Sequence, residues 1–263
     1  MIDLHCHLLP GVDDGAKDLE ESLAMARLAV NDGIRAIVAT PHVRNGLYHH
    51  TREELEERFI RLKEYLQVQG LPLTLYLGAD IHLSPGLIQH LERQELPSIN
   101  NRRYLLLELP SFALPSALQE ILFKLRAKGF IPVVTHPERN GAIQKNPEQA
   151  VELSRFGALF QVTAMSLTGE FGGKVRDCAA ALLEKGLVQV LATDAHSPRN
   201  RPPFLAAGVR AAEKLIGKEA ALRLVTDHPE RILAGAPWPD QEFQKKPESS
   251  RLKKLPFFAR LLR

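Results

Sequence analysis

Seven short β-rich runs, separated by stretches of helical periodicity, constrain the fold of this 263-residue chain more than any other feature. The predicted strands are Ile2–Cys6, Ala36–Thr40, Leu73–Ala79, Tyr104–Leu109, Ile131–Thr135, Leu159–Thr163 and Val188–Thr193. The intervals have the apolar spacing of amphipathic helices, at residues 19–31, 51–69, 116–128, 146–156, 171–185, 204–216 and 220–233. Strands that alternate with helices favour parallel βαβ units.

The end of the first strand separates two architectures that such units can build. A doubly wound sheet usually carries a glycine-rich phosphate-binding loop there, whereas this chain has His5-Cys6-His7. A length of about 250 residues is also typical of a single α/β barrel. We therefore predict an α/β fold, a distorted (β/α)7 barrel of the TIM type.

The composition changes after Pro239, where the barrel pattern ends. Residues 240–263 hold seven basic and three acidic side chains, a net charge of +4 within a total of +3, which leaves −1 for residues 1–239. The basic pI therefore belongs to the tail and does not indicate a nucleic-acid-binding body. We predict a domain at residues 1–239 and a basic tail at residues 240–263.

The tail supports a separate, weaker hypothesis about location. Its last nine residues pair apolar bulk with positive charge, which is typical of a segment that contacts a membrane surface or a partner. A disordered, solvated tail is the alternative. The chain has no apolar run of the roughly 20 residues that span a bilayer, and no signal-peptide pattern precedes Ile2. We expect a cytoplasmic protein, peripheral to the membrane if the tail docks there.

Side chains of the types that bind metals stand at the carboxyl ends of six of the seven predicted strands. They are His5 and His7, His42, Asp80, Glu108, His136, and Asp194 with His196. In a parallel barrel these ends open on one face, where active sites are built. We expect the side chains to converge there, although a single histidine at a strand end is usually a structural residue.

The number and type of these side chains predict more than one metal ion. Residues i and i+2 of a strand point the same way, so His5 and His7 can face one ion, and Asp194 and His196 repeat this spacing. Imidazoles combined with carboxylates suit Mn²⁺, Fe²⁺ or Zn²⁺. We predict two or three divalent ions, and such a pair can clamp the attacking and leaving oxygens of a phosphoryl displacement.

The two cysteines argue against another route to phosphoryl transfer. A cysteine phosphatase needs an arginine six residues after its nucleophile, and here Val12 follows Cys6 and Glu184 follows Cys178 at that distance. Cys6 is better explained as a small buried residue of the first strand.

Several segments together resemble one known family. They are residues 1–15, 39–42, 108–110, 136–139, 161–172 and 193–196. They are similar to the polymerase and histidinol phosphatase (PHP) superfamily, and more closely to its bacterial manganese-dependent protein-tyrosine phosphatases, the CpsB/YwqE group. The first segment, with Pro10-Gly11-Val12-Asp13-Asp14-Gly15, and the segment His136-Pro137-Glu138-Arg139 are the most specific to the phosphatases.

This resemblance implies the PHP form of the barrel and a trinuclear site. One ion would take His5, His7, Asp80 and Asp194; a second Asp80, Glu108 and His136; a third Asp14, His42 and His196. Asp14 is preferred over its neighbour Asp13, which can be a turn residue, only because of the resemblance. The family usually has Glu at position 80, so Asp80 could change metal affinity or choice.

The resemblance also implies the catalytic residues and the substrate. Arg139 and Arg201 would bind the phosphate, with Arg199 an equally placed rival of Arg201, and His42 is counted among the catalytic residues. The substrate would be phosphotyrosine in a membrane-associated bacterial tyrosine kinase of capsular or exopolysaccharide synthesis, with manganese as the metal. A phosphatase for a small metabolite such as histidinol phosphate is the alternative, and a non-catalytic, metal-stabilised interaction module is a third hypothesis.

Overall fold

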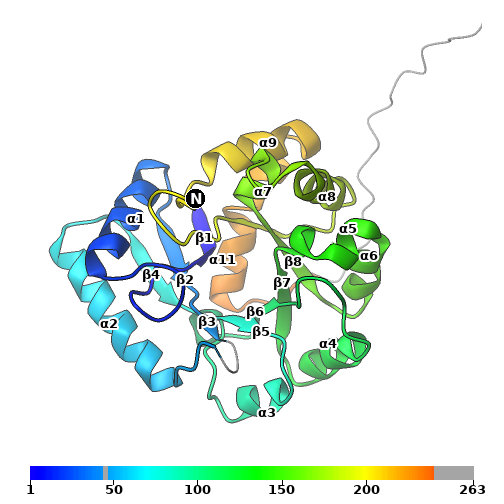
Figure 1. The fold of residues 1–263 in the computed structure, drawn as a ribbon, viewed down its shortest axis with the longest axis horizontal. Helices are drawn as coiled ribbons and strands as arrows, with labels where there is room; N and C mark the ends of the chain where they lie inside the picture. The colour runs from blue at the N-terminus through cyan, green and yellow to red at the C-terminus, as the bar shows by residue number, and fades with distance from the viewer. Residues whose placement is uncertain (44–46, 240–263) are drawn as a thin grey trace, which may run out of the picture.

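The computed structural model describes residues 1–43 and 47–239, and in it the strands close into a barrel that helices surround (Figure 1). The strands are β1 (Ile2–Cys6), β2 (Ala36–Ala39), β3 (His42–Val43), β4 (Thr74–Leu77), β5 (Asp80–His82), β6 (Tyr104–Glu108), β7 (Ile131–Thr135), β8 (Leu159–Thr163) and β9 (Val190–Ala192). Because β2 runs on into β3 and β4 into β5 after short breaks, these nine segments correspond to the seven predicted strands.

All strand pairs are parallel, in the orders β1-β2-β4 and β3-β5-β6-β7-β8-β9. A bridge between Cys6 and Ala195 joins the last strand to the first, and the amide of Asp194 donates to the carbonyl of His5 at 2.8 Å. These contacts close the ring. The breaks at Pro41 and Gly78 are what distort it, so the predicted distorted barrel is confirmed.

The main helices cover the outside of the barrel (Figure 1). They are α1 (Leu19–Asn31), α2 (Arg52–Val68), α4 (Leu118–Ala127), α6 (Glu148–Arg155), α8 (Gly173–Glu184) and α9 (Ala206–Ile216), each within a predicted interval. Thr51 and Glu54 form the capping box expected at the start of α2. No helix in residues 1–43 or 47–239 has both the length and the apolar character needed to cross a membrane.

One helix prediction was wrong, and several short elements were missed. Residues 220–233 form two helices, α10 (Lys218–Arg223) and α11 (Asp227–Ala234), instead of one. The break at residues 224–226 lets the carbonyl of Val225 accept from the amide of Ile2, which ties the segment to β1. The missed elements are α3 (Leu87–Glu92), α5 (Gly141–Lys145), α7 (Ala164–Thr168) and the 3-10 turns η1 (Ile99–Asn101) and η2 (Pro137–Arg139).

The barrel interior is apolar at one end. A cluster of buried side chains draws members from six of the seven strand lines, including Leu4, Val38, Leu106 and Val133, and also contains Ile232 of α11. The partly buried Tyr76 of β4 packs against it. A second, larger cluster fills the space between strands and outer helices. The apolar end is the amino-terminal one, so the carboxyl ends of the strands are left for polar side chains.

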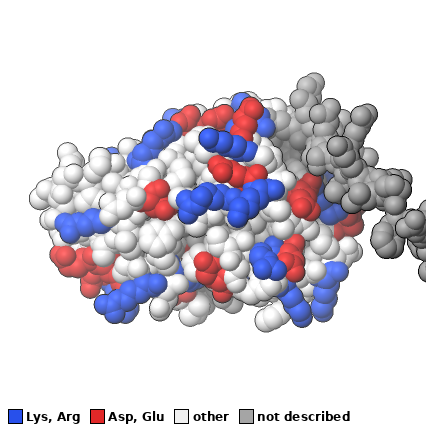
Figure 2. Space-filling view, turned by 90° about the horizontal axis from the view of Figure 1, so that it is seen from above, with Lys and Arg blue, Asp and Glu red and all other residues white. Residues whose placement is uncertain are grey.

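The outer surface carries both charge signs. On the face seen in Figure 2, lysine and arginine side chains are interspersed with aspartate and glutamate rather than gathered in one basic patch. The predicted basic tail, residues 240–263, lies outside the described residues.

Candidate metal centre

Two-residue alternation along the strands carries polar side chains into the barrel beyond its apolar end. Tyr104 and Leu106 belong to the interior cluster and Glu108 follows them on the same face, just as Thr135 follows Val133. On β1 the interior cluster takes the even-numbered residues Ile2 and Leu4. The pairing of β1 with β2 then shifts between Asp3 and Cys6, and beyond this shift the odd-numbered His5 and His7 point into the barrel.

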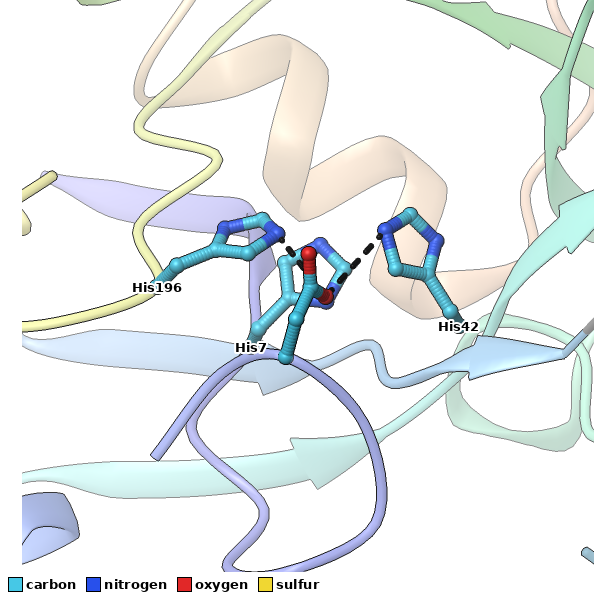
Figure 3. Close-up of side chains that lie close together, drawn as sticks. His7, His42 and His196 are labelled. Atoms are coloured by element: carbon cyan, nitrogen blue, oxygen red, sulfur yellow. Dashed lines mark ion pairs between the residues drawn. The ribbon is translucent and has the colours of Figure 1, made fainter. Parts of the chain in front are cut away.

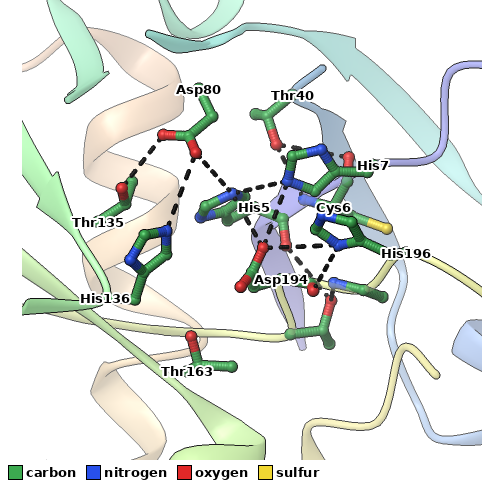
Figure 4. Close-up of polar contacts among 12 residues, drawn as sticks. His5, Cys6, His7, Thr40, Asp80, Thr135, His136, Thr163, Asp194 and His196 are labelled. Atoms are coloured by element: carbon green, nitrogen blue, oxygen red, sulfur yellow. Dashed lines mark hydrogen bonds and ion pairs between the residues drawn. The ribbon is translucent and has the colours of Figure 1, made fainter. Parts of the chain in front are cut away.

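The imidazoles of His5 and His7 meet at the centre of this polar layer (Figure 4). Their Nε2 atoms lie 3.1 Å apart, and each lies 3.3 Å from Oδ1 of Asp194. Nδ1 of His5 lies 2.9 Å from the amide oxygen of Gln161, and Nδ1 of His7 lies 2.7 Å from Oδ2 of Asp13. Because both Nδ1 atoms face acceptors, each ring in its neutral form carries its proton on Nδ1 and presents the Nε2 lone pair to the same point.

A second group of donor atoms surrounds Asp80. Its Oδ2 lies 3.5 Å from Nε2 of His5, 3.3 Å from Nδ1 of His42 and 4.0 Å from Nε2 of His136. Glu108 lies beside it, 3.6 Å from His42 and 3.9 Å from His136. Asp80 therefore belongs to two of the three groups whose donor atoms all lie within 4.8 Å of one another.

The third group contains His7, Asp14, His42 and His196 (Figure 3). Oδ1 of Asp14 lies 3.5 Å from Nε2 of His196 and 3.7 Å from Nε2 of His42. Nδ1 of His196 faces the carbonyl of Asp194 at 3.0 Å, so its Nε2 is the atom available to a ligand. Asp14 is the most exposed of the predicted ligands, and it closes this group from the solvent side.

All nine predicted ligands therefore converge, although their chain positions extend from 5 to 196. Two of them hold unusual backbone conformations at the strand ends, with φ of 35° at His136 and 51° at Asp194. Such left-handed conformations cost of order 1–3 kcal/mol each in residues other than glycine and cluster at functional sites.

The donor atoms fit divalent cations. His42 Nδ1, Asp80 Oδ2 and His196 Nε2 are buried without a hydrogen-bond partner among the described residues, and such atoms are rare unless an ion or ligand satisfies them. Burial and then Asp80 raise the pKa of Glu108 to about 7. Burial opposes charge on His7, yet Asp13 and Asp194 raise its pKa to about 10. The negative charge that favours a proton on the buried imidazole of His7 would equally favour a bound metal cation.

Asp13 contacts a predicted ligand in a way that sequence reasoning missed, because its Oδ2 faces Nδ1 of His7. Its Oδ2 also accepts from the amide of His42 at 2.8 Å, and its Oδ1 accepts from the amide of Gly15 at 2.9 Å. A Cβ at Gly15 would lie 2.3 Å from the carbonyl of His7, so only glycine lets this turn pack against the histidine. The Asp-Asp-Gly sequence signalled a turn, but not that the first aspartate supports His7.

Replacing Asp13 by Asn should lower metal affinity about 10- to 100-fold, the usual effect of removing a carboxylate behind a ligating imidazole. Asn keeps the shape, but it is uncharged and has a single acceptor oxygen. It therefore weakens the acceptor of the His7 Nδ1 proton and cannot keep the contacts of both Oδ1 and Oδ2. Titration with Mn²⁺ followed by isothermal calorimetry measures the change. An unchanged dissociation constant would show that Asp13 only shapes the turn.

A pocket of about 190 Å³ opens beside the donor atoms. Its walls are formed by Asp14, His42, Glu108, Leu109, Ser111, Thr135, His136, Pro137, Arg139, Asn140, Asp194, His196 and Arg201. The guanidinium groups of Arg139 and Arg201 both donate through Nη2 to Oδ2 of Asp194. Arg199, the predicted rival of Arg201, is exposed and does not line the pocket.

Residues 1–234 match the family model described as capsular polysaccharide synthesis, CpsB/CapC. The chain belongs to the CpsB/CapC family. It is 37% identical to the tyrosine-protein phosphatase YwqE of Bacillus subtilis over 233 residues, 89% of this chain and 91% of the relative. It is 32% identical to the tyrosine-protein phosphatase CpsB of Streptococcus pneumoniae over 241 residues, 89% of this chain and 98% of the relative.

Solved structures agree with this membership of the CpsB/CapC family. One, from work on YwqE of Bacillus subtilis and CpsB of Streptococcus pneumoniae as metal-dependent tyrosine phosphatases, matches with a TM-score of 0.86 and 36% identity, covering 90% of this chain and 96% of the other. A lactonase of Listeria monocytogenes matches with a TM-score of 0.52 at 11% identity, covering 88% and 94%, and shows only the shared barrel fold.

Proposed function

We propose that this protein is a metal-dependent phosphomonoester hydrolase that removes phosphate from phosphotyrosine in proteins. Two arginines beside a cluster of metal-type ligands carry the proposal. Nε of Arg139 and Nε of Arg201 are buried without a hydrogen-bond partner among the described residues, although each Nη2 is bound to Asp194. Buried N–H donors are normally satisfied, so a pocket that leaves two of them free suits an oxyanion.

The ligands would be the nine convergent residues: His5, His7, Asp14, His42, Asp80, Glu108, His136, Asp194 and His196. Two or three divalent ions fit this set, with Mn²⁺ proposed and Fe²⁺ or Zn²⁺ possible from the ligand types. When bound, such ions activate water and neutralise charge on the transferred phosphoryl group. Asp80, which reaches two groups of donors, would bridge two ions.

The chain's own residues bind and orient the substrate. Arg139 and Arg201 would donate to non-bridging oxygens of the phosphoryl group, where charge increases in the transition state. Gln161 and Asp13 keep the protons of His5 and His7 on Nδ1. His42 lies where the pocket meets the ligand cluster, and we retain it as a catalytic residue.

Apolar surface at the rim supports an aryl substrate over a small polar one such as histidinol phosphate. Phe112 is 88% exposed, next to Ser111 in the pocket wall. The carbonyl of Ser111 accepts from the amide of Gly141 at 2.8 Å, which ties this loop to the segment that carries Arg139. A tyrosine ring whose phosphate enters the pocket could contact Phe112, and aromatic pairs contribute about 0.5–1.5 kcal/mol.

The family description supports a role in capsular polysaccharide synthesis, and the name of the relative YwqE supports a phosphotyrosine substrate. We propose a phosphotyrosyl protein, a membrane-associated tyrosine kinase of polysaccharide synthesis, as the physiological partner.

The decisive experiment measures metal content and hydrolysis together. The purified protein should contain two or three Mn, Fe or Zn ions per chain and hydrolyse p-nitrophenyl phosphate and phosphotyrosyl peptides. Chelation should abolish turnover and Mn²⁺ should restore it, because the cations would activate the attacking water and the side chains of the cluster cannot replace them in that role. Histidinol phosphate and phosphoseryl peptides serve as competing substrates. Turnover that stays absent after Mn²⁺ addition would favour a non-catalytic module.

We also propose that residues 1–239 form the catalytic domain and that residues 240–263 act in docking. Deleting residues 240–263 should leave kcat/KM for p-nitrophenyl phosphate unchanged, because every ligand and both arginines precede residue 240. Binding to anionic liposomes should weaken if the tail contacts a membrane. Equal liposome binding by both proteins would remove the docking role.

A further inference from the structure

Phe171 lies against both phosphate-binding candidates. Its ring centroid is 5.1 Å from Cζ of Arg139 and 5.8 Å from Cζ of Arg201. Arg139 comes from the turn after β7 and Arg201 from the loop after β9, so one ring contacts side chains from two separate segments. Both distances lie within the roughly 6 Å over which the negative face of an aromatic ring attracts a cation.

The two guanidinium groups need such support because they carry like charges and share one acceptor. Both donate to the same carboxylate oxygen, Oδ2 of Asp194. Nη2 of Arg201 also donates to the main-chain carbonyl of Asp194 at 2.9 Å. These contacts hold each guanidinium group through Nη2 and leave rotation about that end. A ring in contact with both cations restricts this rotation and partly offsets their mutual repulsion.

The turn that holds Phe171 is built for this position. It lies between Gly169 and Gly172, whose φ angles of 96° and 91° are costly for other residues, at the junction of α7 and α8. The residues just before this turn, at the end of β8 and in α7, are hydrogen-bonded to the turn η2 that carries Arg139. The buried carboxylate of Glu138 accepts from the amide of Thr163 at 2.9 Å and from the hydroxyl of Ser166 at 2.6 Å.

We infer that Phe171 is a positioning residue for phosphate binding: its ring holds the guanidinium groups of Arg139 and Arg201 in the wall of the pocket that both residues line. This inference rests on the proposed function, since it takes the bound anion to be a phosphoryl group. It also gives a role to one residue of the segment 161–172, which the family resemblance singles out without assigning a role.

The first test changes the electronics of the ring and keeps its shape. Phe171 is replaced by 4-fluoro-, 3,5-difluoro- and 3,4,5-trifluorophenylalanine, which weaken the negative face stepwise. The Kd of inorganic phosphate for the Mn-loaded protein is measured by calorimetry, so the readout does not depend on turnover. We expect the Kd to rise with each fluorine, reaching about tenfold for the trifluoro ring. Equal values across the series would overturn the inference.

Conventional variants supply the matched controls. Phe171→Leu should raise the Kd of phosphate and the KM for p-nitrophenyl phosphate about tenfold, whereas Phe171→Trp should restore both because Trp binds cations best. Metal content should stay constant. Phe123→Leu, at an exposed position on α4, controls for loss of a phenyl ring. Failure of Trp to restore binding would indicate packing alone.

The outcomes separate this inference from the proposed function. If the unsubstituted Mn-loaded protein binds no phosphate and hydrolyses no aryl phosphate, the proposed function fails first. If it does both and the Phe171 series shows no trend, only the positioning role fails.

Discussion

Replacing Asp80 by Asn is expected to lower kcat/KM for p-nitrophenyl phosphate by about a thousandfold or more. Asp80 lies fully buried among His5, His42 and His136, and its carboxylate reaches two groups of donor atoms. Asn keeps the shape but removes the negative charge that would bridge two cations. Steady-state kinetics, with elemental analysis of bound Mn, measure both consequences.

Asp80→Glu is the matched control, because it keeps the carboxylate and restores the residue expected at this position from the family resemblance. The added methylene must fit beside Thr135, whose hydroxyl donates to Asp80 at 3.1 Å, so a smaller loss from overpacking is expected. Mn²⁺ should also raise the Tm of Asp80→Asn less than that of the unsubstituted protein. If Asn retained full activity and full metal content, the bridging role would be wrong.

Arg139→Ala is expected to lower kcat/KM about 100- to 1000-fold while leaving metal content unchanged. The variant loses one of the two guanidinium groups proposed to bind the phosphate, whereas Asp194 is still held by Arg201. The Kd of inorganic phosphate should rise in parallel. Kinetics, phosphate calorimetry and elemental analysis of the same preparation test this.

Arg176→Ala removes an exposed arginine that pairs with Asp177 on α8, and should leave all three quantities unchanged. The metal content of Arg139→Ala decides between two roles for Arg139. If metal content fell in proportion to activity, Arg139 would act by holding Asp194 in place rather than by binding phosphate.

The barrel could be predicted because each strand has a local sequence pattern that identifies it. β7 and β8 have the predicted bounds, since β-branched and apolar runs lie between turn residues. The helix pair α10 and α11 could not be predicted, because the break between them is set by a long-range bond from Ile2 to Val225. Periodicity reports only which side chains are apolar and says nothing about such a partner.

The convergence of the predicted strand-end ligands could be foreseen for a similar reason, whereas the residues that support them could not. Histidines and carboxylates at strand ends must meet wherever the strands are parallel and closed, so one rule places His5, His136 and Asp194 together. Asp13 and Phe171 come from loops, where no period fixes direction. Their contacts with His7 and with the two arginines appear only once distant segments are packed.

The choice between Arg199 and Arg201 shows the same limit. Both follow β9 within a few residues, and sequence spacing favours neither. The amides of His196 and Ser197 both donate to the carbonyl of Arg201, and this turn directs the Arg201 side chain toward Asp194.

The sequence by itself determined the strands, the types of ligand and the end of the barrel where they gather, because alternation and strand direction are local properties. Only the tertiary structure decided which nitrogen of each imidazole is free, which arginine faces the pocket, and what holds it there. Those depend on hydrogen bonds and ring contacts between residues far apart in the chain, and the geometry of such contacts is set by packing.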